Sequence, residues 1–490
     1  MATPLPPNRA PFTVAEIVEA TGGEVVAHGS ASAAAGVSTD TRAIEDGTCF
    51  VALRGEKHDG HAHLAAAREK GAAIAVVDRD VEAPAGLTVI RTADSLVALG
   101  DLARFHARRW RSAGEGRAGR RVVALTGSAG KTTTRVAISA LLEEVTTGVH
   151  STRGNLNNRV GAPLVLLGLE PEHRFAVVEL GMNQPGEIKE LARIVEPDVG
   201  LCTLVAAAHT ELLGGIDGVA REKRALLDAL AKTGVALGNA DDAIVASFLA
   251  EAPPARRISY GARPSAEVVI RGREPVGMTS SRLRLMVPAE ELALDFETPL
   301  LGDAGAYASA AAVAVVHLAL GFPVDSATCQ RAFAKADVGA GAGRLLPRVF
   351  ASGLAIIDDT YNANPTSTCA SIRAAAEIAR ATKRRLLLAL GEMRELGAES
   401  APGHDQVGRA AAESGAAFLV AIGGGDAPRI AARAAEGGIK AAYAERVEDA
   451  AVLLGMQGLG EDLLLVKGSR SIGTERVIAL LGEQSAGVKA

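Results

Sequence analysis

The sequence predicts an α/β protein of three domains. Apolar, β-branched runs alternate with helical patterns between about residues 121 and 237, and again between about residues 354 and 466. Such alternation is typical of a mostly parallel sheet covered by helices on both faces. The chain of 490 residues is also too long for one compact core. We therefore expect domains over residues 1–115, 116–322 and 323–490.

Composition narrows the class of protein. Hydrophobic residues make up 48% and charged residues 22%, a globular balance, and the net charge is −5. No broad basic field favours nucleic acid or an anionic membrane, so an anionic ligand must be met by local groups. The four cysteines form no CxxC pair, which argues against a zinc site and for a reducing, cytoplasmic location.

Two segments bear on targeting. The proline-containing N-terminus, Met1–Phe12, has no apolar core of a secretory signal, so we expect none. Ala304–Phe322 carries no formal charge, but it is rich in Ala and Gly and contains His317. We predict a buried helix there and no membrane span.

The first domain shows short elements. We predict helices over Thr13–Gly22 and His63–Gly71 and strands over Thr48–Leu53 and Ala72–Val77. The charged, glycine-containing run Arg109–Arg120 is interpreted as a linker.

The second domain begins with the predicted strand Arg121–Thr126, which leads through a glycine-containing turn into the predicted helix Thr132–Glu144. Further strands are predicted at Phe175–Leu180, Val199–Leu204 and Gly234–Leu237. Arg256–Pro299 alternates and predicts antiparallel strands, and Gly302–Gly321 returns to helix.

The third domain is predicted to contain an open, Rossmann-like α/β sheet. Its strands are expected at Leu354–Asp358, Arg385–Leu390, Ala417–Ile422 and Leu463–Val466, and its helices at Ser367–Ala379 and Gln406–Ser414.

The strongest motif is a phosphate-binding loop between a strand and a helix. Its residues are Gly127, Ser128, Ala129, Gly130, Lys131, Thr132 and Thr133. Glycines allow successive backbone N–H groups to face one anion, and the helix N-terminus adds partial positive charge. Lys131 supplies a full charge for the outer phosphates, and Thr132 offers a hydroxyl to Mg²⁺. The loop lacks the first glycine of the general pattern, which would stand at Leu125.

Polar residues at strand ends are candidates for a metal site. Glu179 follows the buried run Phe175–Val178, and His209 follows Val199–Ala208. Carboxyl ends of parallel strands border the crevice in which open α/β sheets bind ligands. Lys223 lies in a charged stretch that by itself indicates a solvated helix face.

At this point the motifs resemble those of the Mur ligases, ATP-dependent amide ligases of bacterial cell-wall synthesis. The phosphate loop is similar to theirs, which also lacks the first glycine. Gly154-Asn-Leu-Asn-Asn158, Glu179-Leu-Gly-Met-Asn183 and Asn239-Ala-Asp-Asp242 resemble their central-domain signatures, and His209 falls at their histidine position. The resemblance implies a nucleotide-sugar-binding first domain, a central ATP-binding domain and a third domain that completes the site.

Within the family, the third-domain motifs are most similar to those of the member that adds D-alanyl-D-alanine to UDP-N-acetylmuramoyl tripeptide. They are Asp358-Asp-Thr-Tyr-Asn-Ala-Asn-Pro365, Gly391-Glu-Met-Arg-Glu-Leu-Gly397 and Val466-Lys-Gly-Ser-Arg470. The implied partners are these two small molecules, with no nucleic acid, no membrane span and a monomeric chain. The implied cofactors are ATP and two Mg²⁺ ions.

The resemblance also implies roles for individual residues. Lys131, Glu179, His209 and Lys223 are implied to be catalytic; Thr132, Glu179, His209 and a carbamylated Lys223 would hold metal. The nucleotide is implied to be met by the phosphate loop with Asn239, Arg344 and Asp359. Substrates are implied to be met by Ser38, Thr39, Asp40, Thr41, Arg42, Asn155, Asn158, Tyr361, Asn362, Asn364, Lys467 and Arg470, with Lys467 or Arg470 on the dipeptide carboxylate.

One segment departs from the family. Family members carry a histidine and two asparagines near adenine where this chain has Ala304, Gly305 and Ala308, and Tyr307 is a possible substitute. Each lost polar contact costs about 1 kcal/mol of nucleotide binding.

The residues support transfer of the ATP γ-phosphoryl group to a carboxylate, followed by attack of an amine on the acyl phosphate. Two alternatives stay open: a family member that adds the third residue, and a nucleotide-binding scaffold with impaired catalysis. The sequence does not indicate which diamino acid ends the tripeptide.

Overall fold

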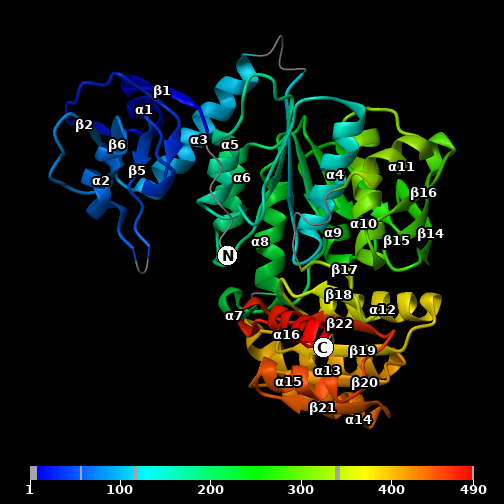
Figure 1. The fold of residues 1–490 in the computed structure, drawn as a ribbon. Coiled ribbons are helices and arrows are strands. Elements are labelled where there is room, and N and C mark those ends of the chain that lie inside the picture. The colour runs from blue at the N-terminus through cyan, green and yellow to red at the C-terminus, as the bar shows by residue number, and fades with distance from the viewer. Residues whose placement is uncertain (1–7, 56–57, 114–118, 209, 337–342, 488–490) are drawn as a thin grey trace.

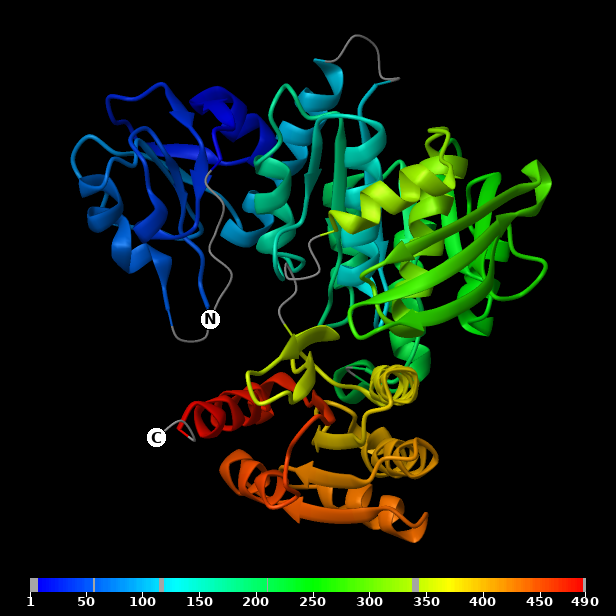
Figure 2. The same cartoon turned by 45° about the vertical axis from the view of Figure 1, so that its right-hand side comes forward.

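The computed structural model describes residues 8–55, 58–113, 119–208, 210–336 and 343–487. Three α/β units follow one another along the chain, each with its own sheet (Figure 1). The first unit lies to one side of the central unit, and the third lies below it in both Figure 1 and Figure 2. The predicted three-domain α/β class is confirmed.

The first unit contains a small, mostly parallel sheet in the order β2-β7-β6-β5-β4. A separate pair, β1 and β3, runs antiparallel. The strands are β1 (Pro11–Thr13), β2 (Glu24–Ala27), β3 (Ala33–Ala35), β4 (Val37–Ser38), β5 (Cys49–Val51), β6 (Ile74–Val77) and β7 (Thr88–Arg91). The helices are α1 (Val14–Thr21), η1 (Thr41–Ala43), η2 (Gly60–His63), α2 (Leu64–Glu69) and α3 (Ser95–Ser112). The capping box between Thr13 and Glu16 explains why α1 begins where it does.

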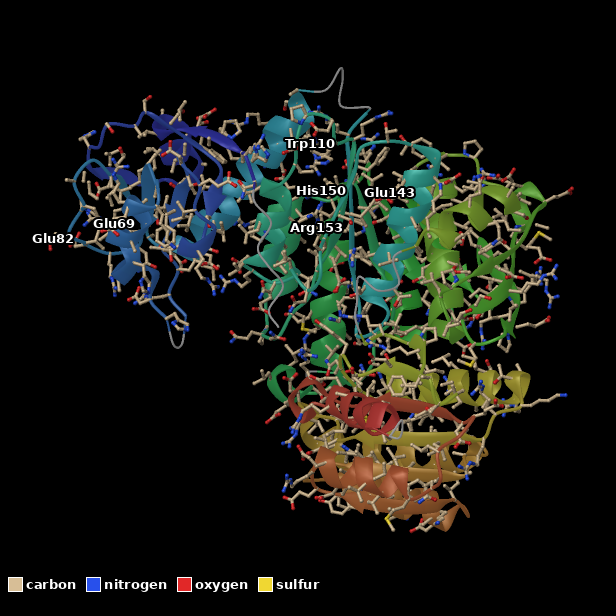
Figure 3. All side chains as sticks on the ribbon, in the orientation of Figure 1. Glu69, Glu82, Trp110, Glu143, His150 and Arg153 are labelled. Atoms are coloured by element: carbon tan, nitrogen blue, oxygen red, sulfur yellow. The ribbon has the colours of Figure 1, made fainter. Side chains whose placement is uncertain are left out.

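Helix α3 corrects the predicted linker, because Arg109–Ser112 form its last turn. The charged pattern suggested a linker, but arginines of this helix make ion pairs across the boundary between the units. Arg104, Arg108 and Arg111 all pair with Glu196 of the central unit. Trp110, labelled in Figure 3, is buried and donates its indole N–H to the carbonyl of His173 at 3.0 Å. The start of the run, Arg109–Ser112, is therefore a helix end docked on the central unit, and residues 114–118 lie outside the described residues.

The central unit contains a nine-stranded sheet in the order β16-β15-β14-β13-β12-β11-β8-β10-β9. Its strands are β8 (Arg121–Thr126), β9 (Val149–Ser151), β10 (Phe175–Glu179), β11 (Val199–Cys202), β12 (Val235–Asn239), β13 (Arg256–Gly261), β14 (Val268–Val276), β15 (Ser280–Val287) and β16 (Leu292–Thr298). Its helices are α4 (Lys131–Val145), α5 (Gly161–Leu167), α6 (Glu187–Val195), α7 (Thr210–Leu213), α8 (Ile216–Asp228), α9 (Ala243–Glu251), η3 (Pro288–Glu290), α10 (Gly302–Val313), η4 (Ala314–Ala319) and α11 (Ser326–Ala334).

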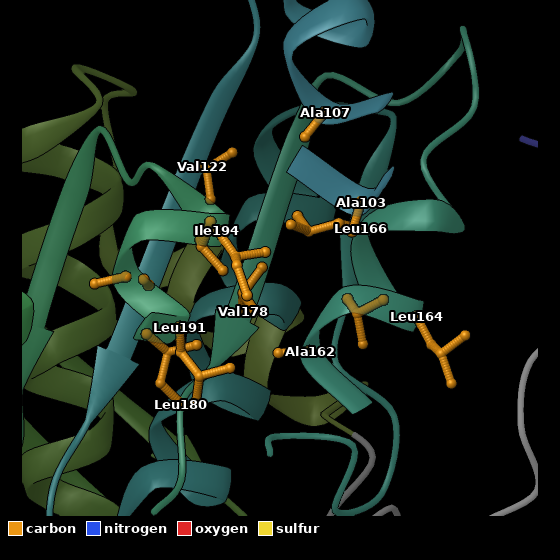
Figure 4. Close-up of a cluster of buried hydrophobic side chains, with 14 of the residues drawn as sticks. Ala103, Ala107, Val122, Ala162, Leu164, Leu166, Val178, Leu180, Leu191 and Ile194 are labelled. Carbon is orange, nitrogen blue, oxygen red and sulfur yellow. The ribbon is translucent and has the colours of Figure 1, made fainter. Parts of the chain in front are cut away.

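The core of this unit continues into the first. Figure 4 shows Ala103 of α3 beside Leu166 of α5, and Ala107 of α3 and Ile194 of α6 belong to the same buried cluster. Aliphatic side chains thus join the first two units without a gap.

Antiparallel strands occur where the sequence predicted them, in β14, β15 and β16, although β13 runs parallel to both of its neighbours. The apolar segment after them forms α10 and η4 and is buried against α4, as predicted. Among the described residues no helix is long and apolar enough to cross a membrane. Helix α11 falls inside the range expected for the third domain but packs on the central sheet, where Phe333 stacks on Phe296 with ring centroids 5.2 Å apart.

The third unit contains a six-stranded sheet in the order β17-β18-β22-β19-β20-β21, parallel except at β17. Its strands are β17 (Leu346–Val349), β18 (Ala355–Asp359), β19 (Leu386–Gly391), β20 (Phe418–Ile422), β21 (Lys440–Ala444) and β22 (Leu463–Lys467). Its helices are α12 (Pro365–Thr382), η6 (Gly397–Glu399), α13 (Ser400–Glu413), α14 (Ala427–Glu436), α15 (Val447–Gly455), η7 (Arg470–Ile472) and α16 (Glu475–Gly487). The carboxyl ends of β18, β22 and β19 lead into residues that line the cleft described below.

Replacement of Trp110 tests whether α3 is a structural part of the central unit. We expect Trp110→Ala to lower the free energy of unfolding by about 3–5 kcal/mol, because it empties a filled core site and removes a hydrogen bond. Urea unfolding followed by circular dichroism measures the change, with exposed Val26→Ala as control, expected within about 0.5 kcal/mol. A Trp110→Ala loss no larger than the control's would contradict the docked helix.

Candidate functional site

The phosphate loop connects β8, a central strand of the sheet, to α4. Gly127 and Gly130 adopt φ of 150° and 81°, and Lys131 Nζ donates to the Gly127 carbonyl at 2.8 Å. A Cβ at Gly127 would lie 1.9 Å from Thr203 Oγ1, so only glycine fits against the neighbouring strand end. The loop is therefore held in shape by the end of β11 and by its own lysine.

Beneath the loop, Glu179 ends β10 and is 1% exposed. Thr132 Oγ1 donates to its Oε2 at 2.9 Å, and Asn157 Nδ2 donates to its Oε1 at 2.8 Å. Strands β8 and β10 are parallel neighbours, so their carboxyl ends bring the helix start and the carboxylate together. The two oxygen donors that the sequence predicted for a metal, Thr132 and Glu179, are adjacent.

Two lysines line the same pocket as this carboxylate, Lys131 partly buried and Lys223 buried. Burial lowers the pKa of Lys131, while Glu179 opposes that shift. Lys223 on α8 is 2% exposed, and burial, with the Lys131 cation second, lowers its pKa to about 7. The charged sequence pattern around Lys223 had indicated a solvated face, but the structure turns this side chain inward. A substantial fraction of Lys223 is consequently a neutral amine at neutral pH.

A cleft of about 970 Å³ lies between the central and third units. It gathers most residues that the sequence singled out: Gly127, Ser128, Ala129, Gly130, Lys131, Thr132, Thr133, Asn155, Asn158, Glu179, Lys223, Asn239, Arg344, Asp359, Tyr361, Asn362, Asn364, Lys467 and Arg470. One concave surface therefore carries the loop, the carboxylate and the third-unit motif residues.

Five predicted residues of the first unit do not line this cleft. Ser38, Thr39, Asp40, Thr41 and Arg42 lie in the first unit, where Asp40 caps η1 and its Oδ2 accepts from Arg42 Nη2 at 2.7 Å. His209 lies outside the described residues.

On the third-unit wall of the cleft, two cationic side chains already contact other groups of the wall. Lys467 Nζ donates to Asp359 Oδ2 at 2.6 Å and to the Asn362 carbonyl at 2.9 Å. Arg344 lies over the Tyr361 ring, with its Cζ 4.0 Å from the centroid. Lys467 is thus already neutralised by a buried carboxylate, which disfavours its expected role on the dipeptide carboxylate.

From the start of α10, the side chains of Asp303, Ala304 and Tyr307 line the cleft, the last two within the unusual segment. Tyr307 donates its hydroxyl to Asp241 Oδ2 at 2.8 Å. Gly305 does not line the cleft; a Cβ there would lie 2.2 Å from the Leu300 carbonyl oxygen. The tyrosine is therefore the aromatic group that this segment offers at the cleft.

Sequence reasoning missed several cleft residues. Asn157 stood inside a quoted motif, but its contact with Glu179 depends on how the loop after β9 folds back. Thr203 carried no signal beyond its strand-end position, and Asp241 and Arg394 lay unremarked within quoted motifs. Spacing along one segment cannot reveal which of two neighbouring polar residues turns inward.

Family models match successive parts of the chain. "Mur ligase family, catalytic domain" matches residues 34–106, "Mur ligase middle domain" residues 125–316, and "Mur ligase, glutamate ligase domain" residues 343–470. The UDP-N-acetylmuramoyl-tripeptide–D-alanyl-D-alanine ligase of Escherichia coli (strain K12) is 32% identical over 450 residues, or 91% of this chain and 93% of that protein. The chain belongs to the Mur ligase family.

Other Mur ligases agree with this assignment. The Bacillus subtilis (strain 168) protein of the same name is 30% identical over 90% of this chain and 92% of its own. A crystal structure of MurF from Acinetobacter baumannii superposes with a TM-score of 0.83 at 31% identity, covering 98% of this chain and all of that one. The resemblance read from the motifs is confirmed.

The low pKa of Lys223 predicts a pH dependence of stability. Between about pH 7 and the ordinary lysine value of 10.5, the unfolded chain holds a proton that the folded chain lacks. The free energy of unfolding should therefore rise with pH across this window, by up to about 1.4 kcal/mol per pH unit. Chemical unfolding at pH 7 and pH 9 in carbonate-free buffer measures it. Lys223→Met should remove this part of the rise, and an identical rise in both proteins would refute the inference.

Proposed function

We propose that this chain is an ATP-dependent, ADP-forming ligase that joins D-alanyl-D-alanine to the terminal carboxylate of UDP-N-acetylmuramoyl tripeptide during synthesis of peptidoglycan precursors. The observation that carries the proposal is the single cleft shared by the phosphate loop and the third-unit motif residues. Relatives whose names state that activity align along about nine tenths of both chains, which supports the choice of substrates.

ATP is proposed to bind with its phosphates on the loop around Lys131. Backbone N–H groups and the start of α4 favour an anion there. Arg344 is close enough to Lys131 to lower the lysine's pKa further, so both cations act on the same region. Asn239 and Asp359 also line the cleft, where we expect them to contact the nucleotide.

Magnesium fits the donor set beneath the loop. Thr132 and Glu179 supply hard oxygens, and Mg²⁺ needs few protein ligands because it keeps waters and phosphate oxygens. Within the described part of the chain, no three His, Cys, Asp or Glu residues could hold a metal together. We propose that water and phosphate oxygens complete the coordination. When bound, the metal would neutralise charge on the transferring phosphoryl group.

A second magnesium is proposed on His209 and a carbamylated Lys223. The neutral amine of Lys223, favoured by its pKa of about 7, can add carbon dioxide and become an anionic oxygen donor. Carbon-13 NMR in labelled bicarbonate tests this: the carbamate signal should appear and should be lost in Lys223→Met. A spectrum without it would refute the second site.

The chemistry follows from what a carboxylate lacks, a good leaving group. The γ-phosphorus accepts a tripeptide carboxylate oxygen, the bond to the β-phosphate bridge breaks, and ADP leaves. The dipeptide amine then attacks the acyl carbon, loses a proton, and inorganic phosphate departs with that carboxylate oxygen. Lys131 and Arg344 neutralise charge during the first step, because positioning and electrostatics dominate phosphoryl transfer.

Substrate roles are proposed for the remaining predicted residues. Ser38, Thr39, Asp40, Thr41 and Arg42 would hold the UDP-sugar end, so the first unit must present the tripeptide to the cleft. Asn155 and Asn158 would border the tripeptide, and Tyr361, Asn362 and Asn364 the dipeptide. Because one chain supplies the whole cleft, we propose that the enzyme acts as a monomer. We also propose that it acts in the cytoplasm.

Phosphate release with one component omitted at a time tests the function. Release from ATP should require Mg²⁺, UDP-muramoyl tripeptide and D-alanyl-D-alanine together. Lys131→Ala should lower kcat at least about 100-fold, because it removes a fixed charge from the transferring group. Lys335→Ala, an exposed lysine paired with Glu144, is the matched control and should keep full activity. Nucleotide binding without release under any combination would favour the scaffold alternative.

A further inference from the structure

Arg394 stands on the third-unit wall of the cleft, in the loop that follows β19. Its side chain is 54% exposed, and its backbone N–H donates to Ser469 Oγ at 2.9 Å. The backbone N–H of Ser469, after β22, in turn donates to the Glu392 carbonyl at 3.2 Å. Two loops at adjacent strand ends thus brace the backbone from which this guanidinium extends.

The counter-ion of Arg394 is buried. Glu392 is 5% exposed, and its Oε2 lies 2.9 Å from Arg394 Nη2 while accepting no hydrogen bond within the described structure. A carboxylate withdrawn from water in this way is costly unless a cation stays beside it. The pair therefore restrains the guanidinium, but it engages only part of a group with five N–H donors.

The turn after β20 leaves room for this carboxylate. A Cβ at Gly425 would lie 2.5 Å from Glu392 Oε1, and one at Gly423 would lie 3.0 Å from Glu392 Cβ. Side chains at these positions would displace Glu392. The absence of side chains at Gly423 and Gly425 therefore gives Glu392 its space.

Other cations of the third-unit wall have different partners. Lys467 is buried against Asp359, Arg344 covers the Tyr361 ring, and Arg470 pairs with Glu475 at 3.5 Å. The acceptor of the proposed reaction is a dipeptide with a carboxylate at its far end. A planar, exposed guanidinium with donors to spare is the group that recognises a carboxylate in a bidentate manner.

We propose that Arg394 binds the carboxylate of the acceptor dipeptide and that Glu392, seated against Gly423 and Gly425, is its positioning residue. This proposal rests on the proposed function, because it assumes that the acceptor carries a free carboxylate. Arg394 then sets specificity for an acceptor with that charge, and Lys467 serves the structure of the wall.

Steady-state rates with two acceptors, D-alanyl-D-alanine and its C-terminal amide, test the proposal. The unaltered protein should prefer the dipeptide in kcat/KM by about 10- to 100-fold, the range for hydrogen bonds to a charged group. Arg394→Ala should bring the ratio close to one by weakening use of the dipeptide alone, with KM for ATP unchanged. Glu392→Gln should reduce the ratio less. Arg394→Lys should keep part of it, since charge remains without the planar fork.

Arg373→Ala is the matched control, because Arg373 lines the same cleft and has a similarly exposed side chain. It should keep the full ratio. A full ratio in folded Arg394→Ala, or a collapse of the ratio in Arg470→Ala instead, would overturn the proposal. If Arg394→Ala fails to fold by circular dichroism, a full ratio in Arg394→Lys overturns it equally.

A binding measurement distinguishes failure of the proposed ligase activity from failure of the proposed Arg394 site. If the unaltered protein forms no product with either acceptor, calorimetry with D-alanyl-D-alanine and the amide on nucleotide-loaded protein replaces the rates. Tighter binding of the dipeptide that is lost in Arg394→Ala would support the Arg394 site, and equal or undetectable binding of both compounds would overturn it.

Discussion

The carboxylate of Glu179 is almost wholly withdrawn from water, and its hydrogen bonds to Thr132 and Asn157 join three segments of the central unit. A charge in such a place is stable only when donors and cations surround it. Arg135, with its Nε 3.6 Å away, and the Lys131 cation supply that surrounding. The hydrogen bond between Thr132 and Glu179 also holds the start of α4 next to the end of β10. The phosphate loop and the metal donors depend on this buried charge balance, and the Lys131 cation also helps burial to lower the pKa of Lys223.

The two sides of the cleft are built differently. The first and central units share one apolar core through α3, so they are expected to behave as one body. Leu301 and Met278 of the central unit pack on the core of the third unit. Polar contacts also cross this boundary, including Thr210 Oγ1 to the Leu396 carbonyl at 2.8 Å and Arg273 Nη2 to Glu377 Oε2 at 2.6 Å. Such contacts exchange readily with water, which suits a wall that must admit a dipeptide and then exclude water from an acyl phosphate.

Local chemistry explains which parts of this arrangement could be read from the sequence. The phosphate loop was predictable because its glycines, lysine and threonine act within one turn, and Glu179 because a polar residue ended an apolar strand. The burial of Lys223 was not, since Asp217 and Arg221 on the same helix α8 face water while Lys223 turns inward. The end of α3 was wrongly predicted to be a linker, because the arginines of this helix pair with Glu196, which is distant in sequence. The Glu392–Arg394 pair depends on glycines about thirty residues further along the chain, which no local pattern indicates.

The fate of one oxygen atom tests the central claim, that the cleft activates a carboxylate before the amine attacks. With the terminal carboxylate of UDP-muramoyl tripeptide labelled with oxygen-18, inorganic phosphate released during amide formation would be examined by phosphorus-31 NMR. An acyl phosphate requires that each amide bond formed sends one labelled oxygen into phosphate. Amide formation accompanied by unlabelled phosphate would contradict it, because the carboxylate oxygen would then have left by another route.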